Sequence, residues 1–313
     1  MDRSFHRNPR PGPLLRVVAP LLLLASAALA QAVPSPATDA AALVRRAVAN
    51  HMAAEGAHHP QRFVLHKKDD RHDYTQEVIE TRQGDVALAI AANGAPLNPD
   101  LRQTQIDRLN NLDAHPDLQE HRHKREQEDN ARVNKLMRLL PDAFVYHYDS
   151  TVSCVVVLAP YVAIPGEPIP PPAGTPVPSA QCYHLTFTPN PAWNPPDLES
   201  KIMRGMAGEV WIETAQERLT RLNAHLIADV DFGWGMIGRL DKGGTIFLEQ
   251  TEMDGNDWEL TRMKIDLAGK ALMVKALSYH ITQEMARYSP VPADLDYHKA
   301  IRMLESEKPL PAK

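Results

Sequence analysis

The stretch Arg221–Phe232, RLNAHLIADVDF, decides the fold that the sequence predicts. Apolar side chains recur at every second position, at Leu222, Ala224, Leu226, Ala228, Val230 and Phe232. Most positions between them are polar, namely Arg221, Asn223, His225, Asp229 and Asp231. Successive side chains of a strand point to opposite faces, so this alternation indicates one face in a core and one in water. The stretch therefore predicts an antiparallel sheet that is covered on one side.

Similar patterns separated by turn residues lie on both sides of this stretch. They are residues 62–68, 73–82, 86–94, 144–147, 151–158, 183–188, 206–214, 236–250, 257–266 and 270–282. Most are joined by short turns, which nearly forces antiparallel pairing. An open sheet of about eleven strands curls. We therefore predict an α+β, mostly β fold, a strongly curved antiparallel half-barrel with helices covering its concave side.

Helical patterns occur at both ends of the chain and in one internal excursion. Residues 39–55 form the first, with Thr38 or Asp39 as the N-cap and Gly56 as the stop. Residues 294–304 form the last. The excursion, 97–141, contains the polar stretch 118–132, followed by an apolar stripe. We expect it to dock at its C-terminal end and to stand in solvent in its middle.

The polar stretch and its end carry more specific expectations. Three oppositely charged pairs are spaced i,i+4, namely Glu120–Lys124, Arg122–Glu126 and Glu128–Arg132. The apolar stripe that follows consists of Val133, Leu136, Met137 and Leu140. Pro141 is expected to end the helix, because proline has no backbone N–H to donate.

A proline-rich segment spans residues 160–180. Eight of the nineteen residues 160–178 are proline, a composition that excludes a core strand or helix. We predict an exposed, extended surface loop at the tip of a hairpin. A proline-rich recognition motif is the alternative.

The first thirty residues predict export. Four arginines precede an apolar run, 17–29, that ends in Ala28-Leu29-Ala30, the small-x-small pattern that signal peptidase cleaves. We place cleavage after Ala30, with a flexible leader at 31–37 and one domain at 38–313. The alternative is an uncleaved anchor. The mature protein is expected in the periplasm or otherwise exported, and not as an integral membrane protein.

The net charge limits the classes of partner, and the cysteine content predicts a disulfide. The chain has a net charge of −5. Residues 1–30 carry four Arg and one Asp, so the mature charge is −5 − 3 = −8, which disfavours nucleic acid. Cys154 and Cys182 are the only cysteines, and an oxidising compartment favours a disulfide between them. Two buried free thiols are the alternative.

Motifs for catalysis or metal binding are lacking. The sequence contains no HExxH, no GxSxG and no phosphate-binding loop. His121 and His123 on one helix face apart, and His58-His59 lie in a loop. Asp229 and Asp231 have a spacing that could suit a glycosidase, but outward acids also occur on any solvated strand. We therefore predict no catalytic residue, no metal and no cofactor.

The concave face is the predicted binding surface. Apolar strand residues would line it as a hydrophobic cavity: Val210, Ile212, Leu222, Leu226, Val230, Phe232, Trp234 and Met236. The alternative is that these side chains form an ordinary solid core.

Three strings resemble periplasmic outer-membrane lipoprotein-sorting carriers, which have the LolA/LolB-like fold. They are MAGEVWIET (206–214), LIADVDFGWGMIGRLDKGGTIFLEQ (226–250) and DWELTRMKIDLAGKALMVK (257–275). The resemblance covers residues 38–281 and extends to uncharacterised exported proteins grouped with these carriers. The excess length falls in 97–141 and 160–180, and no arginine here matches the gating arginine of the carriers.

The resemblance implies a cavity that binds acyl chains. The expected function is a non-catalytic periplasmic carrier for a lipid or lipoprotein acyl chain. A sensor or scaffold of the same fold, binding an envelope protein partner, is the first alternative. An exported hydrolase is the second.

Overall fold

The computed structural model describes residues 39–154, 162, 164–165, 180–232, 238–254, 257–271, 275–308 and 310. The predicted signal peptide, its cleavage site and the leader 31–37 lie outside these ranges. All described residues belong to one compact unit, Ser35–Lys313.

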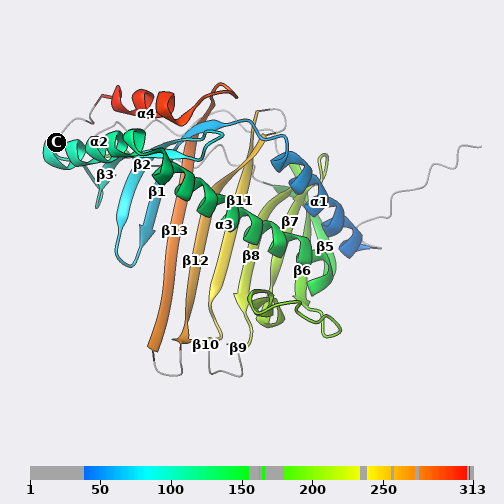
Figure 1. Ribbon diagram of the computed structural model, residues 1–313. Helices are drawn as coiled ribbons and strands as arrows, with labels where there is room; N and C mark the ends of the chain where they lie inside the picture. The colour runs from blue at the N-terminus through cyan, green and yellow to red at the C-terminus, as the bar shows by residue number, and fades with distance from the viewer. Residues whose placement is uncertain are drawn as a thin grey trace, which may run out of the picture. The chain divides into compact units, whose positions relative to one another are not determined.

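A single antiparallel sheet dominates this unit, as the sequence predicts (Figure 1). The described residues form thirteen strands, and the sheet does not close into a barrel. Eleven strands pair in the order β4-β3-β2-β1-β13-β12-β11-β8-β7-β6-β5, while β9 pairs with β10, which pairs with β12. Each strand runs opposite to its neighbours, and this holds also for β1 with β13 and β8 with β11, which no hairpin connects.

The strands differ from the predicted patterns in two places: residues 144–147 and 151–154 lie in one strand instead of two, and residues 236–250 contribute to two strands instead of one. Residues 155–158 of the predicted strand 151–158 lie outside the described ranges. The strands have the following bounds. They are β1 (Gln61–Asp69), β2 (Asp73–Ile79), β3 (Val86–Ala92), β4 (Ala95–Pro96), β5 (Phe144–Cys154), β6 (Ala180–Pro189), β7 (Met206–Glu213), β8 (Leu219–Leu226), β9 (Val230–Phe232), β10 (Gly238–Leu240), β11 (Thr245–Asp254), β12 (Asp257–Ala271) and β13 (Lys275–Pro290).

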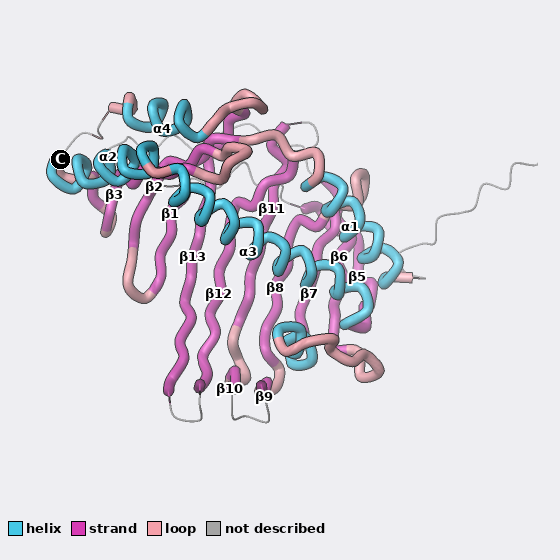
Figure 2. Tube along the Cα trace, in the orientation of Figure 1, coloured by secondary structure: helices cyan, strands magenta, loops and turns pink. Residues whose placement is uncertain are grey.

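The helices are α1 (Ala40–Glu55), α2 (Pro99–Ala114), α3 (Pro116–Ala143) and α4 (Tyr297–Glu305), with a short 3-10 helix η1 (Glu199–Gly205). In Figure 2, α3 crosses in front of the strands from one side of the sheet to the other. The Asp39 side chain caps α1 by accepting from Ala42 N at 2.8 Å, as predicted. None of the described helices is both long and apolar enough to cross a membrane.

The two faces of the sheet differ in chemistry. Val210, Leu222, Leu248 and Met263 form one cross-strand row over β7, β8, β11 and β12. This inner face bears α1, whose Leu43, Val44, Ala47 and Val48 pack on Leu185, Val210 and Ile212. The next row, on the outer face, contains Arg221, Glu249, Arg262 and Glu284. Glu249 pairs with Arg221 at 2.5 Å and with Arg262 at 3.6 Å, so this row is ionic.

The opening stretch is not one strand. It breaks at residues 227–229, between β8 and β9. Long-range backbone bonds explain the break, because Ile227 N donates to Gly205 O at 2.7 Å and Leu226 N donates to Gly244 O at 2.8 Å. The alternation of apolar residues therefore spans two strands, β8 and β9, with a turn between them.

The helical excursion differs from its prediction in three ways. It is two helices, α2 and α3, separated at His115. Pro141 does not end α3, which continues to Ala143, because the loss of one N–H donor is tolerated in the final turn. Arg132 pairs with Asp129 at 2.9 Å and with Glu199 at 3.1 Å instead of Glu128, because η1 brings a closer acid.

The proline-rich segment is not wholly exposed. Most of residues 160–180 lies outside the described ranges, but Val162 and Ile164 are buried. They pack with Val64, Ile90 and Ala286, which belong to β1, β3 and β13. Burial of these apolar side chains lowers the free energy of the folded state, so this part of the segment is held on the sheet.

The predicted disulfide is present. Cys154 and Cys182 are bonded, with their Cα atoms 5.3 Å apart on the paired strands β5 and β6. The described chain has no free cysteine.

Candidate functional site

The inner face is a solid core on the side that α1 and the end of α3 cover. Among the predicted cavity residues, Val210 and Ile212 are buried beneath α1. Leu226 and Val230 are buried in a second cluster, which Leu136, Leu139 and Leu140 of α3 contact. These four side chains are therefore covered by protein.

The other four predicted residues lie elsewhere. Leu222 and Phe232 are only partly buried at the margin of the second cluster. Trp234 and Met236 lie outside the described residues. The predicted set thus marks where the solid core gives way to a less covered surface.

That less covered surface lies on β12 and β13. We call it the open inner face and define it by Ile265, Leu267, Leu277, Tyr279 and Ile281. Cross-strand pairing joins Ile265 to Ile281, Leu267 to Tyr279 and Gly269 to Leu277. Ile265 also pairs with Ile246 of β11, which contacts the second cluster, so this surface continues the inner face.

The open inner face is accessible to solvent. Tyr279 is 52% exposed and Leu277 is 42% exposed, while Ile265, Leu267 and Ile281 are half-buried. A contiguous set of exposed large apolar side chains on a folded chain is typical of a binding surface. Isolated exposed apolar residues would need no such explanation.

The middle of α3 does not contribute apolar cover. Residues 124–133 are exposed apart from Glu126, and nine of these ten side chains are polar or alanine. Val133, the one large apolar side chain among them, is 56% exposed. A helix packed tightly on a sheet would bury a stripe of apolar side chains instead. The middle of α3 therefore passes over the sheet without completing a core.

The N-terminal half of α3 is anchored by polar contacts. Gln119 Nε2 donates to Gln83 O at 2.8 Å, and Glu126 Oε2 accepts from Asp85 N at 3.2 Å. Gly84 lies directly beneath, with φ of +98° and room for no side chain, since a Cβ there would lie 2.7 Å from Glu126 Oε2. Burial raises the pKa of Asp85 to about 7.

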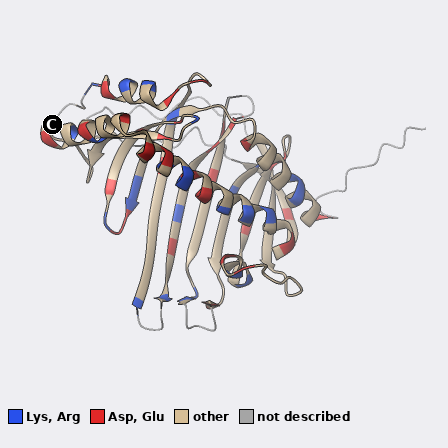
Figure 3. Ribbon diagram, in the orientation of Figure 1, with Lys and Arg blue, Asp and Glu red and all other residues tan. Residues whose placement is uncertain are grey.

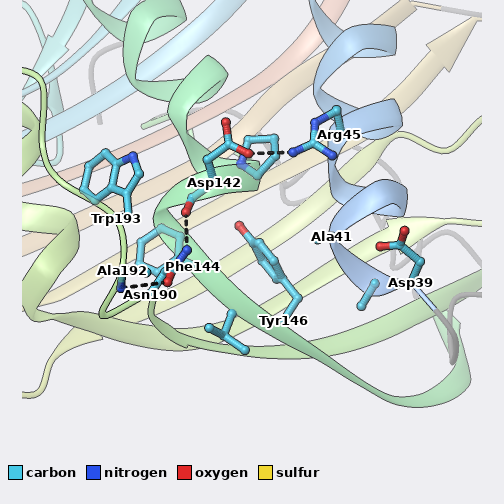
Figure 4. Close-up of a pocket in the computed structure, with 12 residues that line it drawn as sticks. Asp39, Ala41, Arg45, Asp142, Phe144, Tyr146, Asn190, Ala192 and Trp193 are labelled. Atoms are coloured by element: carbon cyan, nitrogen blue, oxygen red, sulfur yellow. Dashed lines mark hydrogen bonds and ion pairs between the residues drawn. The ribbon is translucent and has the colours of Figure 1, made fainter.

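A pocket of about 580 Å³ lies near the N-terminus of α1, beside β5 (Figure 4). Its polar groups are engaged with one another: Arg45 Nη2 lies 2.5 Å from Asp142 Oδ1, and Asn190 Nδ2 donates to Asp142 O at 2.9 Å. The Tyr146 hydroxyl donates to Leu140 O at 2.9 Å, and burial raises its pKa. The pocket therefore has matched charges and is a weaker candidate than the open inner face.

A polar cluster joins α1 to the sheet. His58 Nε2 lies 2.7 Å from Glu80 Oε2, and its Nδ1 lies 3.4 Å from Glu259 Oε1. The hydrogen bond to Glu80 raises the pKa of His58 to about 9, and burial raises the pKa of Glu259 to about 7. Arg218 is buried nearby over the Trp258 ring, 5.8 Å from its centroid. These groups come from four separate parts of the chain and hold them together.

The acids that sequence spacing offered for catalysis are bound to one arginine. Arg239 contacts Asp231 at 2.7 Å and Asp229 at 3.4 Å, and all three side chains are exposed. In the part of the chain that the structure describes, no group of three or more His, Cys, Asp or Glu side chains could hold a metal ion.

Comparison with known proteins yields no relative. No protein-family model, no curated protein and no solved structure matches the chain. The lipoprotein-sorting resemblance therefore remains a prediction from sequence patterns, and the candidate site is argued from its own geometry.

Sequence reasoning missed the residues of the open inner face. The signal was present, since Leu277, Tyr279 and Ile281 alternate with Ala276, Ser278 and His280. The alternation predicts a strand but does not reveal that its apolar row lacks cover. Only the placement of α1 and α3 decides that.

Proposed function

We propose that the protein binds a lipid acyl chain on the open inner face and acts as an exported carrier without catalysis. The observation that supports it is the cross-strand set of apolar side chains on the inner face of β12 and β13, in which Leu277 is 42% exposed and Tyr279 is 52% exposed, so that the set lacks full apolar cover. An acyl chain would supply this cover.

The inner and outer faces of β12 and β13 differ in chemistry. This difference supports a specific binding surface on the inner face. On the outer face of the same two strands, Lys264 pairs with Thr282 and Asp266 pairs with His280. His280 Nδ1 lies 2.8 Å from Asp266 Oδ1, so this face has its own polar partners. The apolar side chains are confined to the inner face, where they adjoin the buried cluster beneath α3.

The free energy of removing methylene groups from water is large enough for an acyl chain to bind this surface. Each CH₂ group removed from water contributes about 0.8 kcal/mol, so a few methylenes on this surface give measurable affinity. From Leu277 to Ile281 the strand extends about 14 Å at 3.4 Å per residue. Leu277, Tyr279 and Ile281 thus form an elongated apolar row that matches the shape of an extended chain.

The test compares inner and outer substitutions on one strand. The double variant Leu277→Gln/Tyr279→Gln alters the inner face, and Ala276→Gln/Ser278→Gln is its outer control. All four positions are exposed, so folding should be little affected. The readouts are titration with dansyl-undecanoic acid and native mass spectrometry of the full chain purified from cells.

We expect the wild-type protein and the outer variant to bind the probe, and the inner variant to bind about tenfold more weakly, since each lost apolar contact costs part of a buried side chain. Co-purified lipid should appear in the wild-type mass spectrum. Failure of the wild-type protein to bind the probe, or equal losses in both variants, would contradict the proposal.

A further inference from the structure

A row of polar side chains lies on the inner face next to the open inner face. It consists of Gln283 of β13, Lys67 of β1 and Tyr74 of β2, since Lys67 pairs in register with both of the others. Gln283 also pairs with Met263, a member of the inner row that starts at Val210. The three polar side chains therefore belong to the inner face, and we call them the donor row.

The next residue of β1, Lys68, points to the outer face. Its Nζ lies 3.1 Å from Asp73 Oδ2, and His66 Nε2 lies 2.9 Å from Asp73 Oδ1. His66 pairs in register with Glu284 of the ionic outer row. Because successive side chains of a strand point to opposite faces, Lys67 points inward.

The donor row has no protein partner in the part of the chain that the structure describes. The side chains of Lys67, Tyr74 and Gln283 are half-buried, yet none forms a hydrogen bond or an ion pair with a described residue. An ammonium, a phenol and an amide all donate hydrogen bonds, so the row suits a ligand group that accepts them. An anion would also neutralise the charge of Lys67.

The acids of the adjoining β1–β2 turn are engaged elsewhere. Asp69 lies on the same face as the donor row, but its carboxylate accepts from Arg71 N at 2.8 Å and from His72 N at 2.9 Å. Asp70 accepts from Ser278 Oγ at 3.0 Å. Figure 3 shows basic residues at the end of β1 and acidic residues in the turn that follows. These two described carboxylates are therefore held by the turn and by β13, and neither pairs with the donor row.

The donor row adjoins the apolar side chains directly. Ile281 lies two residues before Gln283 on β13 and pairs with Ile265. Lys67 is thus a diagonal neighbour of Ile281, within reach of a long side chain. From Gln283 to Leu277 the strand extends about 20 Å, with donors at one end and apolar side chains along the rest.

We propose that the ligand of the open inner face is an amphiphile with an anionic head group, a carboxylate or a phosphate, that the donor row binds. Lys67 supplies a charge-assisted hydrogen bond, and Tyr74 and Gln283 supply neutral ones. The acyl chain extends from there over Ile281 toward Leu277. The inference rests on the proposed function and narrows it, because a neutral ester lacks the charge that Lys67 binds.

The experiment titrates the full chain with two fluorescent probes. Dansyl-undecanoic acid has a carboxylate, and its methyl ester lacks the charge. The test variant is Lys67→Gln, and Lys67→Arg restores a positive charge at the same position. The control is Lys68→Gln, which removes the neighbouring lysine on the outer face.

We expect the wild-type protein to bind the acid about tenfold more tightly than the ester, because hydrogen bonds to charged groups are the stronger ones. Lys67→Gln should weaken binding of the acid about tenfold and change binding of the ester by less than about twofold. Lys67→Arg should recover most of this loss, and Lys68→Gln should match the wild-type protein.

Displacement of the bound acid identifies the head group. Decanoate and decyl phosphate should each displace it at lower concentration than decanol, and the more effective anion gives the class of head group. Equal displacement by all three compounds would overturn the inference. Equal affinity of the wild-type protein for acid and ester, or equal losses in Lys67→Gln and Lys68→Gln, would also overturn it.

The ester separates the two proposals. If it binds as tightly as the acid and Leu277→Gln/Tyr279→Gln weakens both, the acyl-chain function stands and the head-group inference is wrong. If neither probe binds the wild-type protein, both are wrong.

Discussion

The imidazole of His58 donates from Nε2 to Glu80 Oε2 at 2.7 Å, joining the loop after α1 to the end of β2. The same carboxylate accepts from Gln61 N at 2.8 Å. Glu80 therefore fixes both the loop and the first residue of β1. The pKa of His58 is raised to about 9, chiefly by this hydrogen bond, which outweighs the effect of burial.

The first prediction concerns this pair. The pKa of His58 is higher in the folded chain than its ordinary value of 6.5, so its contribution to stability is complete below pH 6.5 and is lost as the pH rises through about 9. Between these limits the free energy of unfolding should fall by on the order of 1 kcal/mol, discounted because the side chain is 36% exposed. Urea unfolding at several pH values measures it. Glu80→Gln should flatten this dependence, and His59→Gln should preserve it.

The second prediction concerns Glu259. Burial raises its folded pKa to about 7, above its ordinary 4.5, so the folded state binds more protons in that window. This carboxyl therefore lowers stability as the pH rises from 4.5 to 7. The Glu259→Gln variant should gain on the order of 2 kcal/mol relative to wild type across that range. Parallel stability curves for the two proteins would contradict the burial assigned to Glu259.

The third prediction concerns Ile164. It is 3% exposed and packs against the outer side of β1 and β13, so Ile164→Ala should lower the free energy of unfolding by about 2–4 kcal/mol. The control is Val133→Ala, because Val133 is 56% exposed on α3. Equal and small effects in thermal or urea unfolding would mean that the proline-rich segment is exposed, as the sequence alone predicts.

The fourth prediction concerns Gly208 of β7. A Cβ there would lie 2.1 Å from Asn223 O and 2.8 Å from Ala224 Cα, both backbone atoms of β8. Gly208→Ala should therefore destabilise the protein by about 1–3 kcal/mol through displacement of β8. Gly56→Ala is the control, since its Cβ would lie 3.5 Å from the nearest atom, Ala53 O. Differential scanning calorimetry should show a lower Tm only for Gly208→Ala.

The fifth prediction concerns the disulfide. Cys154 and Cys182 are 28 residues apart, and closing a loop of that size stabilises by about 3–4 kcal/mol in the chain-entropy model. Cys154→Ala/Cys182→Ala should lower the free energy of unfolding by this amount in the absence of reductant. Adding reductant should destabilise the wild-type protein similarly and leave the double variant unchanged.

Local patterns predicted most of the elements. Alternation of apolar and polar residues depends only on neighbours along the chain, so the strands around Leu222 and Ile265 could be found from sequence. The N-cap at Asp39 could likewise be predicted, because aspartate is a preferred N-cap residue. The pairing of Cys154 with Cys182 could be predicted because the chain has no other cysteine. The break at 227–229 could not be foreseen, since it depends on Gly205 at the end of η1 and on Gly244 in the turn before β11.

The sequence by itself determined that this chain forms a curved antiparallel sheet with an apolar inner face. Tertiary structure decided which part of that face is covered. Val210 is buried because α1 packs on it, whereas Leu277 and Tyr279 stay exposed because they belong to none of the buried clusters of the described chain. Tertiary structure also brought His58, Glu80 and Glu259 together. Burial and pKa depend on contacts between residues far apart in the chain, and local periodicity carries no information about them.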